Sequence, residues 1–129
     1  DQGGGDVDSR HNYFYPLRIR PGRRTVALSE YGGIAWPMPG HEPPGKTYGY
    51  GTAKDKADLT KRYKMLQWKT ILPQLGRGLS ALVYTQLTDV EDEVNGLFTY
   101  DRAALKPEAA AVRSCNAALA AEFAKVTAK

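Results

Sequence analysis

The sequence predicts an α/β domain built on parallel strands, and three observations support this expectation. The predicted elements follow the order strand, strand, helix, strand, helix; the strand segments are mostly apolar; and polar side chains collect where each strand ends. Apolar runs are typical of strands buried in parallel sheets, and functional groups at the C-terminal ends of such strands are typical of a (β/α) barrel. Three strands are too few to close a barrel. The chain is therefore expected to be either the last part of one or a small open α/β sheet.

The predicted strands are short segments bounded by turn residues. Residues 6–16 contain the first, which runs into a polar, aromatic loop, and residues 20–24, RPGRR, form a turn. Residues 25–31, TVALSEY, have the mostly apolar pattern of a strand buried on both faces. Residues 78–86, GLSALVYTQ, form a further strand that is also expected to be buried, and it too ends in polar groups.

A helix is predicted from about Asp55. Asp55 and Asp58 can cap its first turn and complement the helix dipole, and Pro73 and Gly76 are expected to end it. Its apolar positions recur with the spacing of one broad buried helix face. These positions are Leu59, Tyr63, Leu66, Trp68, Ile71, Leu72 and Leu75.

An alanine-rich helix is predicted at the end of the chain. Pro107 is well placed at its first position, where a missing N–H has no cost. The apolar residues recur at spacings of three and four, which indicates one buried face. These residues are Val112, Cys115, Leu119, Phe123 and Val126.

A long loop rich in Gly and Pro separates the second strand from the helix. It covers residues 32–56 and shows no helical period, and loops of this length are usually functional or disordered. Trp36, Tyr48 and Tyr50 favour the first option, because flat aromatic faces stack on sugar rings. The same rings could instead pack beneath the loop.

Composition argues against several classes of function. The formal net charge of +4 suggests nucleic-acid binding, but the basic residues lie in a local run at 18–24 and on the outer face of a helix, where they are usually solvated. Cys115 is the single cysteine, so no internal disulfide forms, and His11 and His41 are too isolated for a zinc cluster. No apolar run has membrane-spanning length. We therefore expect no cofactor, no metal, and neither nucleic acid nor a membrane as partner.

Glu30 is the sharpest candidate for chemistry. A carboxylate at the end of a buried strand loses some solvation, and nearby hydroxyls or cations then decide whether it stays ionised and nucleophilic. The glycines that follow it let the backbone turn and a ligand approach. An ordinary strand-end glutamate bonded to backbone amides has the same pattern, so the segment alone leaves both interpretations open.

Polar side chains also follow the other two strands. His11, Asn12 and Tyr13 end the first, and a phenol such as Tyr13 could reach the carboxylate of a neighbouring strand, although a surface loop would look the same. Residues 84–96, YTQLTDVEDEVNG, are acidic but lack the ligand spacing of a calcium-binding EF-hand. An acidic loop packing against basic neighbours is the simpler interpretation.

These strand ends together resemble one enzyme family. The segments concerned are DVDSRHNYFYP, VALSEYGGIAW, YGYG and above all VYTQLTDVEDEVNGLFTYDR. Over roughly residues 6–107 they look like the closing part of the catalytic TIM (β/α)8 barrel of glycoside hydrolase family 2, which includes β-galactosidases, β-glucuronidases and β-mannosidases. The resemblance implies strand six and its loop in residues 1–24, strand seven with a long active-site loop and helix in 25–77, and strand eight with an acidic loop and helix in 78–129.

The resemblance implies a retaining β-glycosidase with Glu30 as its nucleophile. Tyr13 matches the tyrosine that hydrogen-bonds this glutamate, and His11 and Asn12 would help to line the sugar site. Tyr84 falls where many members place a tryptophan beneath the sugar, a departure that leaves the identity of the sugar open. The further residues assigned to substrate binding are Trp36, Gln86 and Asp89.

The family's acid/base glutamate usually follows an asparagine, and this chain contains no Asn-Glu pair. The resemblance therefore implies that the acid/base residue lies upstream of Asp1. The chain alone is expected to be inactive, because general acid catalysis contributes about 10²–10⁴-fold.

The expected partners are a carbohydrate substrate and the remainder of a parent enzyme, or a second copy of the chain that pairs through exposed strand edges and an apolar helix face. The alternative function is a non-catalytic carbohydrate-binding or interaction module that uses the same loops.

Overall fold

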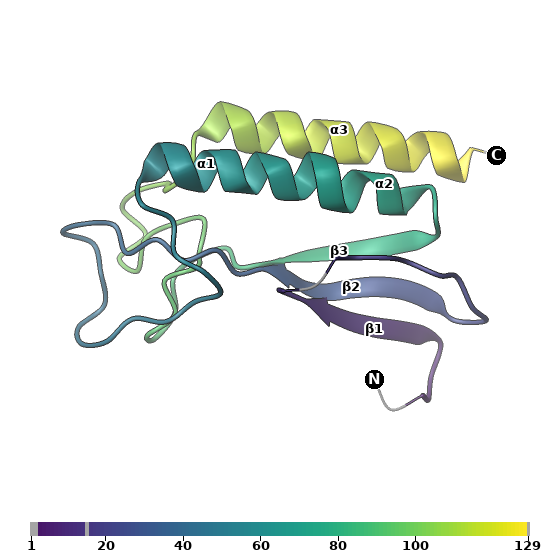
Figure 1. Ribbon diagram of the computed structural model, residues 1–129, viewed down its shortest axis with the longest axis horizontal. Helices are drawn as coiled ribbons and strands as arrows, with labels where there is room; N and C mark the ends of the chain where they lie inside the picture. Colours follow the sequence, from purple (N-terminus) through teal and green to yellow (C-terminus); the bar gives the residue numbers. More distant parts are fainter. Residues whose placement is uncertain (1–2, 15, 129) are drawn as a thin grey trace.

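The structure is a small α/β domain with three parallel strands in one sheet. It is a computed structural model that describes residues 3–14 and 16–128. The strands are β1 (Val7–Asn12), β2 (Thr25–Gly32) and β3 (Leu79–Thr85), and they lie in that order. Both neighbouring pairs are parallel, and Figure 1 shows the three arrows pointing the same way. The predicted strand order and parallel sheet are confirmed.

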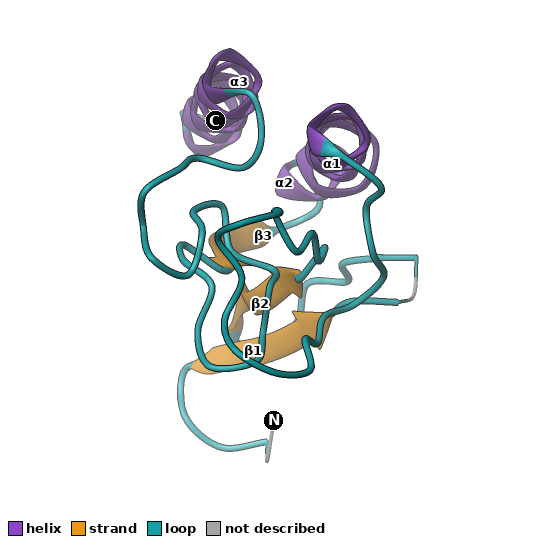
Figure 2. Ribbon diagram, turned by 90° about the vertical axis from the view of Figure 1, so that its left-hand side faces the viewer, coloured by secondary structure: helices purple, strands orange, loops and turns teal. Residues whose placement is uncertain are grey.

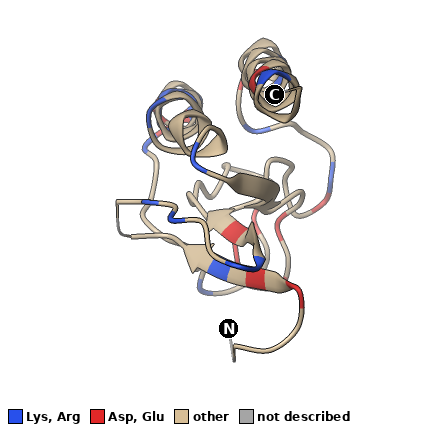
Figure 3. Ribbon diagram, turned by 90° about the vertical axis from the view of Figure 1, so that its right-hand side faces the viewer, with Lys and Arg blue, Asp and Glu red and all other residues tan. Residues whose placement is uncertain are grey.

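The helices lie on one face of this sheet. α1 (Lys56–Met65), η1 (Leu66–Ile71) and α2 (Leu72–Leu75) follow one another without a break, and α3 (Ala109–Thr127) runs beside them. Within the described residues no helix or strand covers the opposite face, as Figures 1 and 3 show. None of these described helices is long and apolar enough to cross a membrane.

The core lies between the sheet and the helices. Val26 and Leu28 of β2 are buried against Ile71 and Leu75 of the first helical run, and Leu28 and Ile71 have no exposed surface. Burying side chains of this kind stabilises the fold by about 1.5–3 kcal/mol each. The other buried members are Ile19, Tyr31 and Leu79. The expectation that residues 25–31 are buried on both faces is wrong, because the intervening residues face the side without helices and are only partly buried.

The helix predicted from Asp55 begins and ends near the expected residues. Asp55 is the N-cap, and its carboxylate accepts a hydrogen bond from the Asp58 N–H at 2.8 Å. The helical run ends at Leu75, with Gly76 as its cap. Pro73 lies inside the last turn, at one of the first positions of α2, rather than after the helix. Tyr15, in the first predicted strand-and-loop segment, lies outside the described residues.

The predicted apolar face of this helix is wrong at one position, Trp68. Trp68 is 40% exposed, whereas its neighbour Gln67 is 1% exposed. The cause is the π-helical segment η1, because i→i+5 hydrogen bonds place more residues in each turn than an α-helix and rotate the side chains that follow. Gln67 Oε1 accepts a hydrogen bond from the Tyr31 hydroxyl at 3.2 Å.

α3 begins later than predicted. Ala109 is the first helical residue and Glu108 the N-cap, so the buried Pro107 precedes the helix instead of opening it. Cys115, in the middle of the predicted apolar face, is buried, but Phe123 is 40% exposed. Phe123 lies at a groove of about 220 Å³ between α3 and the sheet. The groove is lined by Leu75, Ser80, Ala81, Leu82, Leu119, Ala120 and Phe123.

β3 is less buried than predicted. Val83, near its middle, is 57% exposed. Leu82 and Tyr84 pack toward the core, and alternate strand residues point to opposite faces, so Val83 points to the face that no described helix covers. Figure 3 also shows basic and acidic residues interspersed over helices, sheet and loops.

Candidate functional site

Glu30 lies at the end of the sheet where the C-terminal ends of all three parallel strands meet. In the strand ladder His11 lies opposite Glu30 and Asn12 opposite Tyr31, and Tyr31 in turn lies opposite Tyr84. Figure 2 looks onto this end and shows the long loops gathered over it. The fold therefore brings together polar residues that follow separate strands.

Two side chains contact the Glu30 carboxylate. The Tyr13 hydroxyl donates a hydrogen bond to Oε2 at 2.7 Å, and His11 Nδ1 lies 3.3 Å from the same oxygen. The Tyr13 hydroxyl is also 3.1 Å from Thr85 Oγ1, so it links the end of β2 to the end of β3. The Glu30 side chain is 45% exposed. Both contacts go to Oε2, and within the described part of the chain Oε1 forms no hydrogen bond or ion pair.

The Tyr13 hydroxyl is a donor over the whole neutral pH range. Burial is the main cause that raises the pKa of Tyr13 to about 12; the hydrogen bond with Thr85 opposes the shift, and the Glu30 carboxylate adds to it. A phenol with a raised pKa keeps its proton at neutral pH. Its hydrogen bond to an ionised carboxylate is charge-assisted and stronger than one between neutral groups.

The two glycines that follow this carboxylate make room for aromatic rings. Both have positive φ, +98° at Gly32 and +63° at Gly33, a region that residues with side chains rarely adopt. A β-carbon at Gly32 would overlap the Tyr84 ring. A β-carbon at Gly33 would lie 2.5 Å from the Tyr50 ring and 3.0 Å from the Tyr13 ring. The glycines are therefore required by packing as well as by the backbone.

An aromatic cluster stands beside the carboxylate. Tyr13 and Tyr50 stack with ring centroids 3.8 Å apart and planes 6° from parallel. Phe14 and Tyr48 contact Tyr50 edge-on at centroid distances of 5.4 Å and 5.5 Å. The backbone N–H of Tyr50 donates to the Gly33 carbonyl at 2.8 Å, which holds the long loop against the end of β2.

A hollow of about 350 Å³ lies beside this stack. Asn12 borders it, as do Tyr13 and Tyr50, and Asn12 and Thr70 bring an amide and a hydroxyl to an otherwise mostly apolar wall. The other lining residues are Phe14, Pro16, Gly32, Ile34 and Leu66. Aromatic faces combined with a few polar groups are the usual lining of a small-molecule site.

Gln86 is held by a partly buried hydrogen-bond network just beyond β3. The peptide bond between Thr85 and Gln86 is cis. Gln86 Nε2 donates to Asn95 Oδ1 at 2.7 Å and to Glu93 Oε2 at 3.1 Å, and Asn95 Nδ2 donates to the same Glu93 oxygen at 3.0 Å. Asn95 is fully buried. Among the described residues nothing bonds the amide oxygen of Gln86, which is therefore the part of this side chain left for a ligand.

Asp89 forms a buried ion pair. Its Oδ1 lies 2.7 Å from Lys106 Nζ, with both side chains almost fully buried, and it also accepts the Gly96 N–H at 2.7 Å. Lys106 Nζ donates in addition to the carbonyls of Trp36 and Val94, at 3.0 Å and 2.9 Å. The structure thus places Asp89 in a junction between loops. At this residue the acidic segment does pack against a basic neighbour.

The two remaining predicted sugar contacts lie apart from the carboxylate. The Tyr84 ring makes edge contacts with Tyr31 and Tyr63 at 5.5 Å and 5.3 Å, and burial raises the pKa of Tyr84. Trp36 is half-buried, and its backbone N–H donates to the Val94 carbonyl at 2.9 Å. Within the described residues neither ring contacts Glu30.

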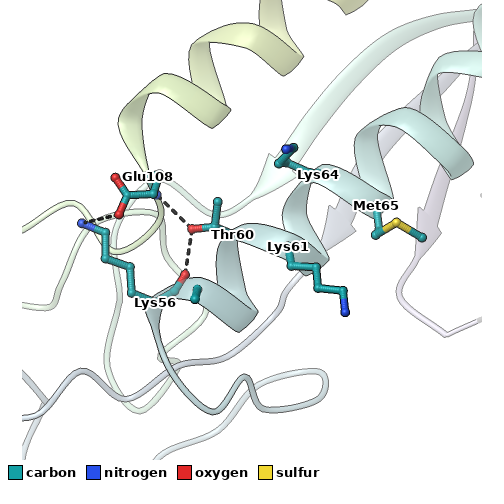
Figure 4. A pocket seen from close by; sticks show the side chains of 7 residues that line it. Lys56, Thr60, Lys61, Lys64, Met65 and Glu108 are labelled. Atoms are coloured by element: carbon teal, nitrogen blue, oxygen red, sulfur yellow. Dashed lines mark hydrogen bonds and ion pairs between the residues drawn. The ribbon is translucent and has the colours of Figure 1, made fainter.

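A second hollow, of about 550 Å³, lies where α1 meets the start of α3 (Figure 4). Lys56 pairs with Glu108 at 3.3 Å, and Thr60 Oγ1 accepts the Glu108 N–H at 3.0 Å. These contacts attach the two helices to each other. Lys61 and Lys64 also line the hollow, but no predicted site residue does.

Sequence reasoning missed two features of the site. The sequence marks Thr85 only as a polar residue at a strand end, and its contact with the Tyr13 hydroxyl depends on the register of the sheet. Tyr50 was considered as a sugar-stacking residue or as loop packing, and the structure places it on Tyr13. Among the described residues no group of three or more His, Cys, Asp or Glu side chains is arranged to hold a metal ion.

In comparisons with known proteins, no protein-family model and no curated protein matches the chain. The geometry around Glu30 and the resemblance of the strand-end motifs are therefore the grounds for a functional proposal.

Proposed function

We propose that the chain is the nucleophile-bearing part of a retaining β-glycosidase resembling glycoside hydrolase family 2. The observation that supports this most is the Glu30 carboxylate at the open end of a parallel sheet, with the Tyr13 hydroxyl 2.7 Å and His11 Nδ1 3.3 Å from its Oε2 atom. On the same proposal the three strands are strands six to eight of a TIM (β/α)8 barrel, whose active site lies at this end of the strands.

The proposed reaction proceeds in two steps. Glu30 Oε1 attacks the anomeric carbon of a β-glycoside while the bond from that carbon to the leaving oxygen breaks. Water then attacks the anomeric carbon of the glycosyl-enzyme and releases Glu30. On this proposal Tyr13 holds Oε2 and thereby orients Oε1, and His11 and Asn12 bind sugar hydroxyls.

The first step also needs a carboxylic acid that protonates the leaving oxygen, about 5–5.5 Å from the nucleophile. Asp89 is engaged by Lys106, and Glu93 by Gln86 and Asn95, so neither suits this role. We assign the role to a segment of a parent enzyme outside this chain, and we expect the chain alone to be inactive on ordinary glycosides.

We expect Glu30 to form a covalent adduct with an activated fluorosugar. A dinitrophenyl leaving group departs without protonation, so such a β-glycoside tests the nucleophile even when the acid is missing. Mass spectrometry should find one glycosyl group on the peptide that contains Glu30. Glu30→Gln should abolish the adduct, and Glu93→Gln, a carboxylate held in the adjoining network, should retain it.

Two results would contradict this proposal. One is an adduct on another residue, or none, in a chain that is folded and binds the sugar. The other is steady hydrolysis of a nitrophenyl β-glycoside by the purified chain and its loss in Glu30→Gln, because the acid would then not come from elsewhere.

The exposed aromatic cluster favours a second candidate, a carbohydrate-binding module without catalysis. Phe14, which lines the hollow, is 71% exposed, and Tyr48, which contacts Tyr50 edge-on, is 50% exposed. Such rings stack on sugars. This candidate predicts weak sugar binding by calorimetry that Glu30→Gln leaves unchanged and that truncation of Phe14 or Tyr48 to alanine removes.

A further inference from the structure

We propose that Tyr50 is a positioning residue that acts on the Glu30 carboxylate through Tyr13. The role rests on the proposed function, in which Glu30 is the nucleophile. The Tyr13 hydroxyl donates a hydrogen bond to the carboxylate at 2.7 Å, and the ring of Tyr50 covers one face of the Tyr13 ring with centroids 3.8 Å apart and planes 6° from parallel.

Tyr13 depends on side-chain contacts for its position. β1 ends at Asn12, so the strand ladder does not hold Tyr13. Its hydroxyl is fixed by Glu30 and Thr85, and its ring lies against Tyr50. A ring at the start of a loop without such packing is free to occupy several staggered rotamers. Most of these would carry the hydroxyl away from the carboxylate.

Tyr50, in contrast, is anchored through its backbone. Its N–H donates to the Gly33 carbonyl at 2.8 Å. Two residues after Gly33, the Ala35 N–H donates to the Gly51 carbonyl at 2.9 Å, and the Ala35 carbonyl accepts from the Ala53 N–H at 2.7 Å. This short stretch of the long loop therefore runs alongside the end of β2. The loop places a rigid aromatic face beside Tyr13, and the absence of a side chain at Gly33 lets both rings approach.

The stack also controls the proton of the Tyr13 hydroxyl. Burial raises the pKa of Tyr13 to about 12, and the Tyr50 ring covers one of its two faces. Removing that ring would expose the phenol and favour its ionised form, which no longer donates to a carboxylate. One face of Tyr50 is thus occupied by Tyr13 rather than by a sugar.

The test is the ionisation of Tyr13, followed by NMR in the full chain labelled with carbon-13 at the tyrosine ζ position. The Tyr13→Phe variant assigns the signal. We expect Tyr50→Leu to lower the pKa of Tyr13 by about one pH unit or more, toward the ordinary phenol value of about 10. Tyr50→Phe keeps the ring and loses only the weak electrostatic effect of the Tyr50 hydroxyl, so it should lower the pKa of Tyr13 far less than Tyr50→Leu does. Phe14→Ala is the matched control, because Phe14 contacts Tyr50 edge-on.

The proposal is overturned if Tyr50→Leu leaves the pKa of Tyr13 at its original value, or if Tyr50→Phe lowers it as much as Tyr50→Leu does. If Tyr50→Leu does not fold, the stacking of Tyr50 on Tyr13 is tested in the wild-type chain instead. Ring-to-ring nuclear Overhauser contacts and upfield-shifted ring protons of Tyr13 are then expected, and their absence overturns the stack.

A second readout separates this inference from the proposed function. Fluorosugar labelling of Glu30 should slow by about tenfold or more in Tyr50→Leu and remain unchanged in Tyr50→Phe, because small displacements of reacting groups cost large factors in rate. If the wild-type chain is never labelled while the titration behaves as expected, the glycosidase function fails but the coupling of Tyr50 to Tyr13 stands. Normal labelling of Tyr50→Leu overturns the positioning role itself.

Discussion

Gly33 determines how closely two aromatic rings approach the strand that bears Glu30. The sequence marks the glycines after Glu30 as unusual, and it identifies Glu30 and Tyr13 as polar strand ends. It does not reveal which rings lie over the glycines, because Tyr50 is separated from Gly33 by loop residues that have no periodic pattern. The pairing of Glu30 with Tyr13 was thus predictable, whereas the packing of the Tyr50 ring on Tyr13 was not.

We expect Gly33→Ala to destabilise the chain more than Gly40→Ala does. Both glycines have positive φ, +63° and +84°, so alanine costs about 1–2 kcal/mol at either position. At Gly40 a β-carbon meets nothing within 4 Å, whereas at Gly33 it lies 2.5 Å from the Tyr50 ring. The crowding at Gly33 should add about 1–3 kcal/mol. Urea denaturation measures both losses, and equal losses would show that backbone strain alone explains Gly33.

At the scale of elements, the strands and the main helix were predictable because their patterns are local. Asp55 and Gly76 marked a helix whose ends the structure confirms. The pattern failed where geometry departs from the α-helical period, at the π segment that exposes Trp68. It also failed at the start of α3, where Ala109 rather than Pro107 is the first helical residue and Glu108 is the N-cap. The loops were the least predictable elements, because contacts between distant residues hold them.

Lys106 joins three of these loop segments, and we expect Lys106→Met to reduce the free energy of unfolding by about 3–5 kcal/mol. The substitution leaves Asp89 buried without its cation and removes the donor to the Trp36 and Val94 carbonyls. The double variant with Asp89→Asn should recover part of the loss, because no unpaired charge then remains. Chemical denaturation measures each step.

An exposed lysine is the control for this prediction. Lys125 on α3 pairs with Glu122 at 3.4 Å and its side chain is 72% exposed, so Lys125→Met should cost less than about 0.5 kcal/mol. A loss at Lys106 as small as that at Lys125, or a double variant less stable than Lys106→Met, would show that the buried pair does not hold the loops together.

At the scale of the whole molecule, the parallel α/β class was predictable from element order, and the structure confirms it. A continuation into a closed barrel is not visible in three strands, so it stays a proposal. The described chain has one sheet face without helices and two sheet edges without a further strand. Exposed edges and apolar faces promote association, and a barrel remainder or a second copy of the chain would cover them.

We expect the isolated chain to self-associate with rising concentration and Val83→Lys to weaken that association. Val83 is 57% exposed on the uncovered face, so a lysine there remains solvated in the monomer and opposes packing of a second sheet. Met65→Lys adds the same charge at a residue that is 52% exposed on α1 and should leave the association unchanged. Sedimentation velocity over a range of concentrations measures it. A chain that stays monomeric throughout, or equal effects of the two substitutions, would mean that this sheet face does not drive assembly.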